Sequence, residues 1–271
     1  MFNKVTFGVL LSLLVVSGIF YACREGRRTY PIVPPEEQTR AYLKIINTAA
    51  SYPHPPGSGN HNPSLDIKYE TYNSSAIIAR NLQFPGGWPS QGYANLIEAG
   101  VKVDSNGTGL LYLSANLNQT WVELMKKQVV KLEGEKKQTA WIIDSAQTFI
   151  VRQTADTYSF TDSTAAIRFY HANAYDMTRD LMIKFRSPRV SGDTCVFGVD
   201  SIFQNNCNFA EQTPFYELKA NRVYDLFVMG RDSTTVLLSK SGIELKPKSA
   251  YALFYYNTSS GSKDFQLVRI E

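Results

Sequence analysis

The feature that most constrains this chain is an internal repeat, because two copies of one sequence pattern should share a fold. The matched segments occur in the same order in both copies: 42–47 with 166–171, 65–69 with 181–185, 93–96 with 215–218, 130–132 with 243–245, and 140–143 with 253–256. Most are short, rich in β-branched and aromatic residues, and bounded by Gly, Asn, Pro or Ser, which is the pattern of strands in an all-β domain. The repeat therefore predicts two tandem β-sandwich domains, at 41–153 and 165–271, joined by a polar linker at 154–164.

One segment of the first copy fits two kinds of secondary structure. Residues 121–132 could form an amphipathic helix, but their counterpart, 234–245, contains Thr234, Thr235 and Gly242, a composition that suits strands better. Because the two copies should share a fold, a strand is predicted in both. Each copy has a full set of strands and enough length for its own core, so each is expected to fold alone.

The two copies end their first predicted strand with related residues. The second copy has Tyr170-His171-Ala172-Asn173 there, and the first has Ile46-Asn47-Thr48-Ala49. With the repeat, these residues resemble the tandem domain-of-unknown-function 4397 family of envelope lipoproteins, typical of Bacteroidota, over about residues 40–271. That family usually has a segment like V-H-A-S-P at this point, from which both copies depart. The resemblance implies an immunoglobulin-like β-sandwich fold and a lipoprotein address, and it implies no activity.

The N-terminus has the layout of a signal peptide. Lys4 gives a positive start, residues 5–20 are apolar, and Ala22 precedes Cys23. We expect cleavage after residue 22 and attachment of lipid, such as palmitate, to Cys23. The alternative is an uncleaved membrane anchor, for which the apolar run is close to the lower length limit of about 17 residues.

The residues around the cleavage point refine this address. Residues 20–23, F-Y-A-C, resemble a lipobox, although Phe20 and Tyr21 replace the usual Leu and small residue. Arg24 follows the cysteine, so the Asp of the inner-membrane retention signal is absent. The sequence predicts an outer-membrane lipoprotein that faces either the periplasm or the cell surface. Residues 23–40 are charged and proline-rich, which favours an extended tether.

The other two cysteines lie in the second copy. An exported protein can keep a disulfide, so Cys195 and Cys207 are predicted to pair. Twelve residues of straight strand would separate them by about 40 Å, and a disulfide needs Cα atoms closer than roughly 7 Å. Residues 196–206 must therefore fold back if the bond forms; the alternative is two unpaired thiols.

The histidines do not form a convincing metal site. His54 and His61 lie in a loop without a nearby acidic residue, and stable zinc sites need three or four ligands. His171 ends a predicted strand, and we expect it to bond the backbone of the following loop rather than to act as a base. No metal and no cofactor are predicted.

Enzyme and nucleic-acid motifs are missing from the sequence. It has no nucleophile elbow, phosphate loop, H-E-x-x-H or dinucleotide fingerprint. The formal charge of +4 is not concentrated in a run, whereas nucleic-acid binders usually show a clustered basic stripe. We therefore expect neither an enzyme nor a nucleic-acid partner.

One end of the first domain is the candidate binding end. If successive strands alternate in direction, loops 48–64 and 85–91 lie at the same end. They carry Tyr52, His54, His61 and Trp88, side chains that can stack on a sugar or anchor a protein partner. The alternative for Trp88 is an inward position that plugs the sandwich.

Four serines follow an aspartate in triplets that resemble the O-glycosylation sites of Bacteroidota envelope proteins: Ser145, Ser163, Ser201 and Ser233. The alternative is ordinary turn chemistry, because Asp-Ser pairs favour turns. Ser163 is the preferred site because it lies in the predicted linker.

These features together predict a non-enzymatic lipoprotein of the cell envelope that binds a glycan or a protein partner. The alternative is a structural spacer or adhesin-like subunit without a small ligand. Fold alone does not decide between the two.

The address is tested by Cys23→Ala. In a Gram-negative host fed labelled palmitate, the natural chain should incorporate label and sediment with membranes. The variant should incorporate none. An uncleaved anchor would leave the variant in the membrane fraction at its full precursor mass.

Overall fold

The structure is a computed structural model that describes residues 40–49, 64–71, 74–84, 86–89, 92–96, 103, 107–117, 124–145, 148–173, 181–186, 200–230, 234–257 and 262–271. The regular secondary structure within these ranges consists of strands, β1 to β17. In this part of the chain no helix is long and apolar enough to cross a membrane.

The first copy contains nine strands: β1 (Tyr42–Asn47), β2 (Leu65–Glu70), β3 (Ser75–Leu82), β4 (Gly86–Trp88), β5 (Ala94–Asn95), β6 (Thr108–Leu117), β7 (Gln128–Glu133), β8 (Lys137–Ser145) and β9 (Thr148–Ala155). The second copy contains eight: β10 (Thr164–His171), β11 (Leu181–Arg186), β12 (Asp200–Cys207), β13 (Tyr216–Lys219), β14 (Val223–Met229), β15 (Val236–Glu244), β16 (Ala250–Asn257) and β17 (Lys263–Arg269).

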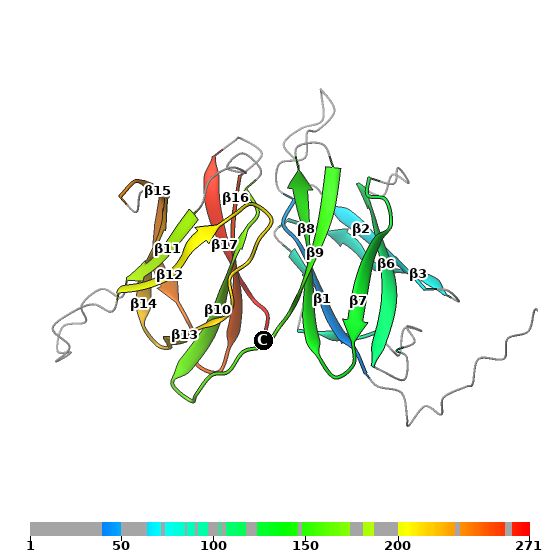
Figure 1. Cartoon of the computed structure of the whole chain (residues 1–271), viewed down its shortest axis with the longest axis horizontal. Coiled ribbons are helices and arrows are strands. Elements are labelled where there is room, and N and C mark those ends of the chain that lie inside the picture. The colour runs from blue at the N-terminus through cyan, green and yellow to red at the C-terminus, as the bar shows by residue number, and fades with distance from the viewer. Residues whose placement is uncertain are drawn as a thin grey trace, which may run out of the picture. The chain divides into compact units, whose positions relative to one another are not determined.

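These strands form four sheets (Figure 1). Sheet A has the order β4-β1-β8-β9, with β5 also paired to β1, and sheet B has the order β3-β2-β6-β7. Sheet C (β13-β10-β16-β17) and sheet D (β12-β11-β14-β15) repeat this order with the equivalent strands. One apolar core lies between sheets A and B, and a second lies between sheets C and D. The predicted fold class, two tandem immunoglobulin-like β-sandwiches, is confirmed.

The register of the repeat is confirmed as well. In each copy the first strand pairs in parallel with the penultimate one, β1 with β8 and β10 with β16. Ile45 lies opposite Ala140 in the first copy, and Phe169 lies opposite Leu253 in the second. The repeat matches Ile45 with Phe169 and Ala140 with Leu253, so equivalent residues pair in both copies. The strand predicted for the ambiguous segment is confirmed in part, because residues 128–132 belong to β7 whereas residues 124–127 lie in no strand. Residues 121–123 lie outside the described ranges.

The burial pattern divides the strands into two kinds. In β7 and β14 buried positions alternate with exposed or partly buried ones, as expected for a sheet with one solvated face. Almost every residue of β1, β10 and β16 is buried, so both faces of these strands are covered. The central strands of sheets A and C are therefore covered on their outer faces as well as on their inner ones.

A third apolar cluster, which we call the joint, covers these outer faces. It combines residues of the first copy, such as Ile46 and Trp141, with residues of the second, such as Tyr170 and Phe254. The rings of Trp141 and Tyr170 meet edge to face, with centroids 4.8 Å apart. Residues 39–271 accordingly form one compact unit.

The joint uses equivalent positions of the two copies. Trp141 and Phe254 are equivalent in the repeat, and their ring centroids lie 6.4 Å apart. Phe84 meets Tyr256 edge to face at 4.6 Å. Their equivalents, Phe209 and Ile143, also belong to the joint. Such self-matching contact is the pattern of a two-fold symmetric interface, here formed within one chain.

The joint predicts the effect of removing its central ring. Trp141 is fully buried, so Trp141→Ala should lower the free energy of unfolding of residues 39–271 by about 3–5 kcal/mol in denaturant titration. Val129→Ala, at a strand position that is 58% exposed, is the matched control and should change it by less than about 0.5 kcal/mol. An unchanged midpoint for the Trp141 variant would contradict a packed joint.

Candidate functional site

The polar centre of the joint is a buried ion pair between the second copy and residues 156–163, the segment that joins β9 to β10 and that we call the connection. Strand β9 ends at Ala155 and β10 begins at Thr164, so Asp156 is the first residue of the segment between them. Its carboxylate lies 3.1 Å from the guanidinium of Arg168, on the outer face of β10. Both side chains are buried, which makes this pair sensitive to its surroundings.

The first copy completes the environment of this carboxylate. The hydroxyl of Tyr93 donates to Asp156 over 2.6 Å, and that of Thr139 donates over 2.5 Å. Burial raises the pKa of Asp156 above its usual value, while the two hydroxyl donors and Arg168 act in the opposite direction. Burial, together with the negative charge of Asp156, also raises the pKa of Tyr93.

Arg168 fixes the start of the connection. Besides Asp156, its guanidinium donates to the hydroxyl of Thr154 over 2.8 Å and to the carbonyl of Ala155 over 3.0 Å. It also lies over the ring of Phe215, 4.0 Å from the centroid, a cation–π contact. One side chain thus joins β9, β10 and the residue before β13.

Lys44 is the equivalent of Arg168 in the first copy and is also buried, with 2% of its surface exposed. Its ammonium donates to the carbonyl of Pro89 over 3.2 Å. Burial lowers the pKa of Lys44, and the charge of Asp156 partly offsets that effect. Each copy therefore places one cation at the same point of the joint.

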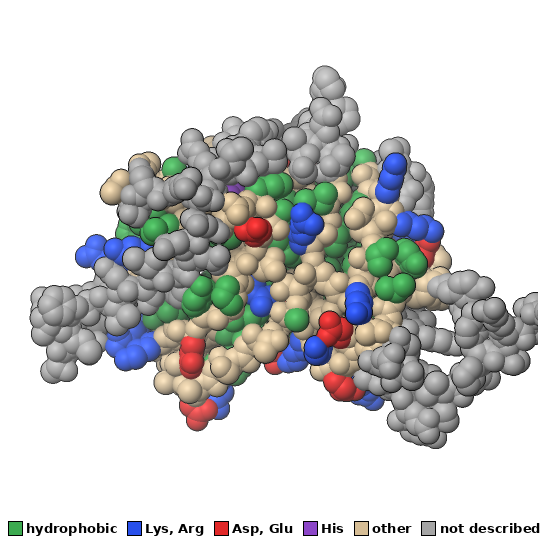
Figure 2. All heavy atoms as spheres, viewed as in Figure 1, with side chains coloured by type: hydrophobic (Ala, Val, Ile, Leu, Met, Phe, Trp, Pro, Cys, Tyr) green, Lys and Arg blue, Asp and Glu red, His purple; other side chains and the backbone are tan. Residues whose placement is uncertain are grey.

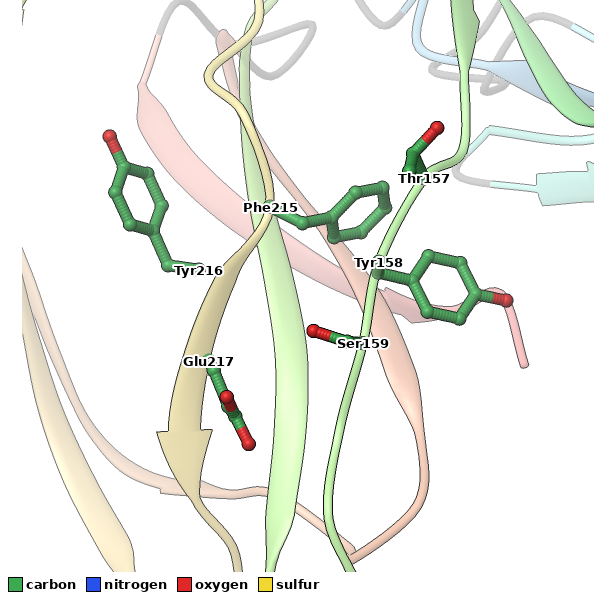
Figure 3. A pocket seen from close by; sticks show the side chains of 6 residues that line it. All are labelled: Thr157, Tyr158, Ser159, Phe215, Tyr216 and Glu217. Carbon is green, nitrogen blue, oxygen red and sulfur yellow. The ribbon is translucent and has the colours of Figure 1, made fainter.

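Beside this centre lies an open hollow of about 240 Å³, which we call the linker hollow. Its lining comes from two segments: Thr157, Tyr158 and Ser159 of the connection, and Phe215, Tyr216 and Glu217 at the start of β13 (Figure 3). Figure 3 shows the ring of Phe215, the residue before β13, pointing toward the connection, whereas Tyr216 points away from it.

The rings at the linker hollow are held by one another. Tyr158 meets Phe215 edge to face at 5.0 Å and stacks on Phe160 at 5.7 Å. The polar groups are more accessible, because Thr157, Ser159 and Glu217 are exposed. Glu217 also accepts a hydrogen bond from the Thr164 hydroxyl over 2.5 Å. A carboxylate and two hydroxyls beside apolar rings can hydrogen-bond a hydroxyl-rich or amide-rich ligand.

Trp88, the predicted ligand-binding aromatic, lies in β4 opposite Ile45 of β1. Its partly buried side chain packs against the core between sheets A and B. This placement favours the inward alternative, while the predicted role in partner binding stays a prediction. Its proposed companions Tyr52, His54 and His61 lie outside the described residues.

The remaining predicted residues are placed only in part. Cys23, Cys195 and Ser233 lie outside the described residues. Ser145 ends β8 and Ser201 lies in β12. Ser163 is exposed in the turn before β10, an accessible position for the predicted modification. The four glycosylation sites stay predictions.

Cys207 and His171 lie close together in the second copy. Cys207 is buried at the end of β12 and forms no disulfide with a described residue, and burial raises the pKa of its thiol to about 12. Its predicted bond to Cys195 stays a prediction. His171 accepts a hydrogen bond at Nδ1 from the backbone N–H of Asn173, 3.3 Å away, which confirms the predicted contact with the following loop.

Neither a patch of one charge nor a cluster of metal ligands marks the part of the chain seen here. On the face seen in Figure 2, basic and acidic side chains are interspersed. Within the described ranges, no three or more His, Cys, Asp or Glu side chains gather as a metal site would require.

Sequence reasoning missed the linker hollow because it treated residues 154–164 as a plain polar linker. The signal that could have revealed it is the presence of two aromatic residues in this segment. Tyr158 and Phe160 are unusual in a solvated connection and indicate one that packs against a domain. The partner segment at 215–217 was recognised only as a strand of the repeat.

The buried pair predicts a pH-dependent loss of stability in Arg168→Met. Near neutral pH the change should cost about 3–5 kcal/mol, because it leaves the Asp156 carboxylate buried without its cation. Removing the cation raises the folded-state pKa of Asp156 further above its unfolded value. Stability is then lost as the pH rises through the folded pKa, so the cost should be smaller in acid, where Asp156 is protonated.

Chemical denaturation at several pH values measures this effect. Arg152→Met, an exposed arginine of β9, is the matched control and should show little change at any pH. A cost that is equal in acid and at neutral pH would show that Arg168 acts by packing alone.

No protein-family model and no characterised protein sequence matches this chain. Among solved structures it is similar to a candidate adhesin from Bacteroides ovatus, at 9% identity over 86% of this chain and 96% of the other, with a TM-score of 0.28. A candidate cell-adhesion protein from Bacteroides uniformis has 8% identity over 86% and 99% of the two chains, with a TM-score of 0.23.

A third similar structure is a family 26 carbohydrate-binding module from Eubacterium rectale in complex with maltoheptaose. It has 12% identity over 84% of this chain and 96% of the other, with a TM-score of 0.24. TM-scores this low add nothing to the fold assignment, which rests on the strand order and register of the chain itself.

Proposed function

We propose that this chain is a non-enzymatic lipoprotein of the cell envelope that binds a glycan or a protein partner. In this proposal a lipid on Cys23 holds it at the outer membrane, and residues 23–40 extend the two sandwiches away from the lipid. Membership of the domain-of-unknown-function 4397 family is part of the same proposal, and it implies no activity of its own.

The observation that carries the binding role is the linker hollow. Ligand sites occur preferentially where two domains meet, because their surfaces there form a concave shape. The hollow lies beside the joint, and the buried contacts of Arg168 hold its two walls in place. A site formed in this way needs little ordering when a ligand enters, which favours affinity.

The chemistry of the lining favours a glycan as the partner. Glu217 and the hydroxyls of Thr157 and Ser159 are exposed and can hydrogen-bond sugar hydroxyls. The rings of Tyr158 and Phe215 offer apolar surface to the C–H groups of a sugar. The hollow has room for a small part of a polymer, such as one or two sugar units, rather than for a whole oligosaccharide.

The second candidate function is a structural spacer or adhesin-like subunit without a small ligand. It is favoured by the joint, which makes residues 39–271 one compact unit instead of two beads on a flexible linker. Two sandwiches packed together through the joint can transmit force without any ligand.

A glycan array probed with residues 39–271 tests the binding role. Binding to one glycan class is expected, and Glu217→Gln should weaken it by roughly tenfold or more, through the loss of a charged hydrogen-bond acceptor. Glu135→Gln, an exposed carboxylate elsewhere on the first copy, is the matched control and should leave binding unchanged.

Trp88→Ala separates the linker hollow from the loop end of the first sandwich. The hollow predicts that this variant keeps its glycan affinity. A loss of affinity at unchanged melting temperature would move the site to the Trp88 end. A silent array with a well-folded protein would favour the spacer.

A further inference from the structure

Glu217 is the one charged side chain among the six described residues that line the linker hollow. It lies in the edge strand β13, opposite Ala166 of β10, and it is exposed. Its equivalent in the first copy is Asn95, because 93–96 match 215–218 and both positions pair with the first strand of their copy. The fold therefore does not require a carboxylate at this position.

The turn before β10 holds one oxygen of this carboxylate. The hydroxyl of Thr164 accepts a hydrogen bond from the backbone N–H of Thr161 over 2.6 Å. Its own proton is therefore available for Oε1 of Glu217, 2.5 Å away. Among the described residues, none donates to the other oxygen, Oε2. A ligand that enters the hollow meets a carboxylate that is held in place and has one oxygen open.

Two basic side chains near the hollow are already paired with acidic ones. Arg168 is buried in its ion pair with Asp156. Lys248 donates its backbone N–H to the carbonyl of Thr164 over 2.9 Å, and its ammonium lies 2.8 Å from the carboxylate of Asp162. Each pair is neutral as a whole, so neither adds net charge beside the hollow.

Lys219 is a third basic neighbour. It lies two residues beyond Glu217 in β13, opposite Thr164, and it is exposed. It does not line the hollow, and within the described ranges no ion pair joins it to Glu217. Solvent and salt screen an exposed ammonium, so the carboxylate sets the sign of the charge in the hollow itself.

The sign of this charge decides which sugar units bind best. A protonated amino group can donate a charge-assisted hydrogen bond to Oε2 of Glu217, which is stronger than the bond from a neutral hydroxyl. An acidic sugar would place a second negative charge beside the first, and the two would repel each other. The other polar lining groups are the hydroxyls of Thr157 and Ser159, which carry no positive charge to offset that repulsion. Figure 3 shows the hydroxyl of Ser159 pointing from the connection toward the side on which β13 lies.

We infer that the linker hollow selects sugar units with a free amino group over neutral units, and neutral units over acidic ones. Glu217 is the residue that determines this order. The inference rests on the proposed glycan-binding function, because it names the class of sugar that the same site takes.

Nuclear magnetic resonance titration of residues 39–271, which form one compact unit, tests the inference. The probes are the methyl glycosides of glucosamine, glucose and glucuronic acid, used near neutral pH. The backbone amide signals of Thr157, Ser159 and Glu217 should shift, and affinity should fall in that order of probes, by roughly tenfold from the first to the last. Added salt should reduce the difference. On the glycan array, chitosan oligomers should likewise bind more strongly than oligomers of glucuronic acid.

Two variants assign the order to the local charge. Glu217→Gln should make the three probes bind about equally, and Lys219→Gln should widen the difference between them. Both positions are exposed, so the circular dichroism spectrum should stay unchanged. An acidic probe that binds as tightly as the amino probe, or an order that survives Glu217→Gln, would overturn the inference and leave glycan binding in place. A silent array together with unshifted signals at the hollow would instead overturn the proposed function, and the inference with it.

Discussion

The packing of sheet A against sheet C is the constraint on which the rest of this structure depends. An isolated sandwich needs one apolar face per sheet, but β1, β10 and β16 are buried on both faces. Trp141, Tyr170 and Phe254 would be exposed to water if the copies separated. Burial of these rings stabilises the unit, at about 25 cal/mol per Å² of apolar area removed from water. It also turns the connection between the copies into part of a packed surface.

The ion pair at the joint adds directional contacts to the apolar packing. Apolar faces can shift against one another at modest cost, whereas a desolvated carboxylate must keep its donors. Asp156 receives donors from Tyr93 and Thr139 of the first copy and from Arg168 of the second. These contacts tie both sandwiches to the same carboxylate. The same contacts set the walls of the linker hollow, so the joint and the candidate site share a physical cause.

Equivalent positions of the two copies keep some contacts and differ in others. Lys44 and Arg168 occupy the same point of the two copies, and both are buried at the joint. Asn47 and His171 also match, and each accepts a hydrogen bond from the backbone N–H two residues further on. On the outer faces of sheets B and D, in contrast, Asp66 and Met182 differ although their strands match.

The sequence alone determined the strand composition, the two copies and their register, because β-branched and aromatic runs with turn residues between them act over short distances. It also indicated His171 correctly from its place at a strand end. It could not show that Tyr158 and Phe160 pack against the second copy, or that Arg168 forms a buried ion pair with Asp156. Those contacts depend on which face of sheet A meets which face of sheet C. That choice belongs to the tertiary structure, because the burial of a whole face is the sum of many side chains that are distant in the sequence.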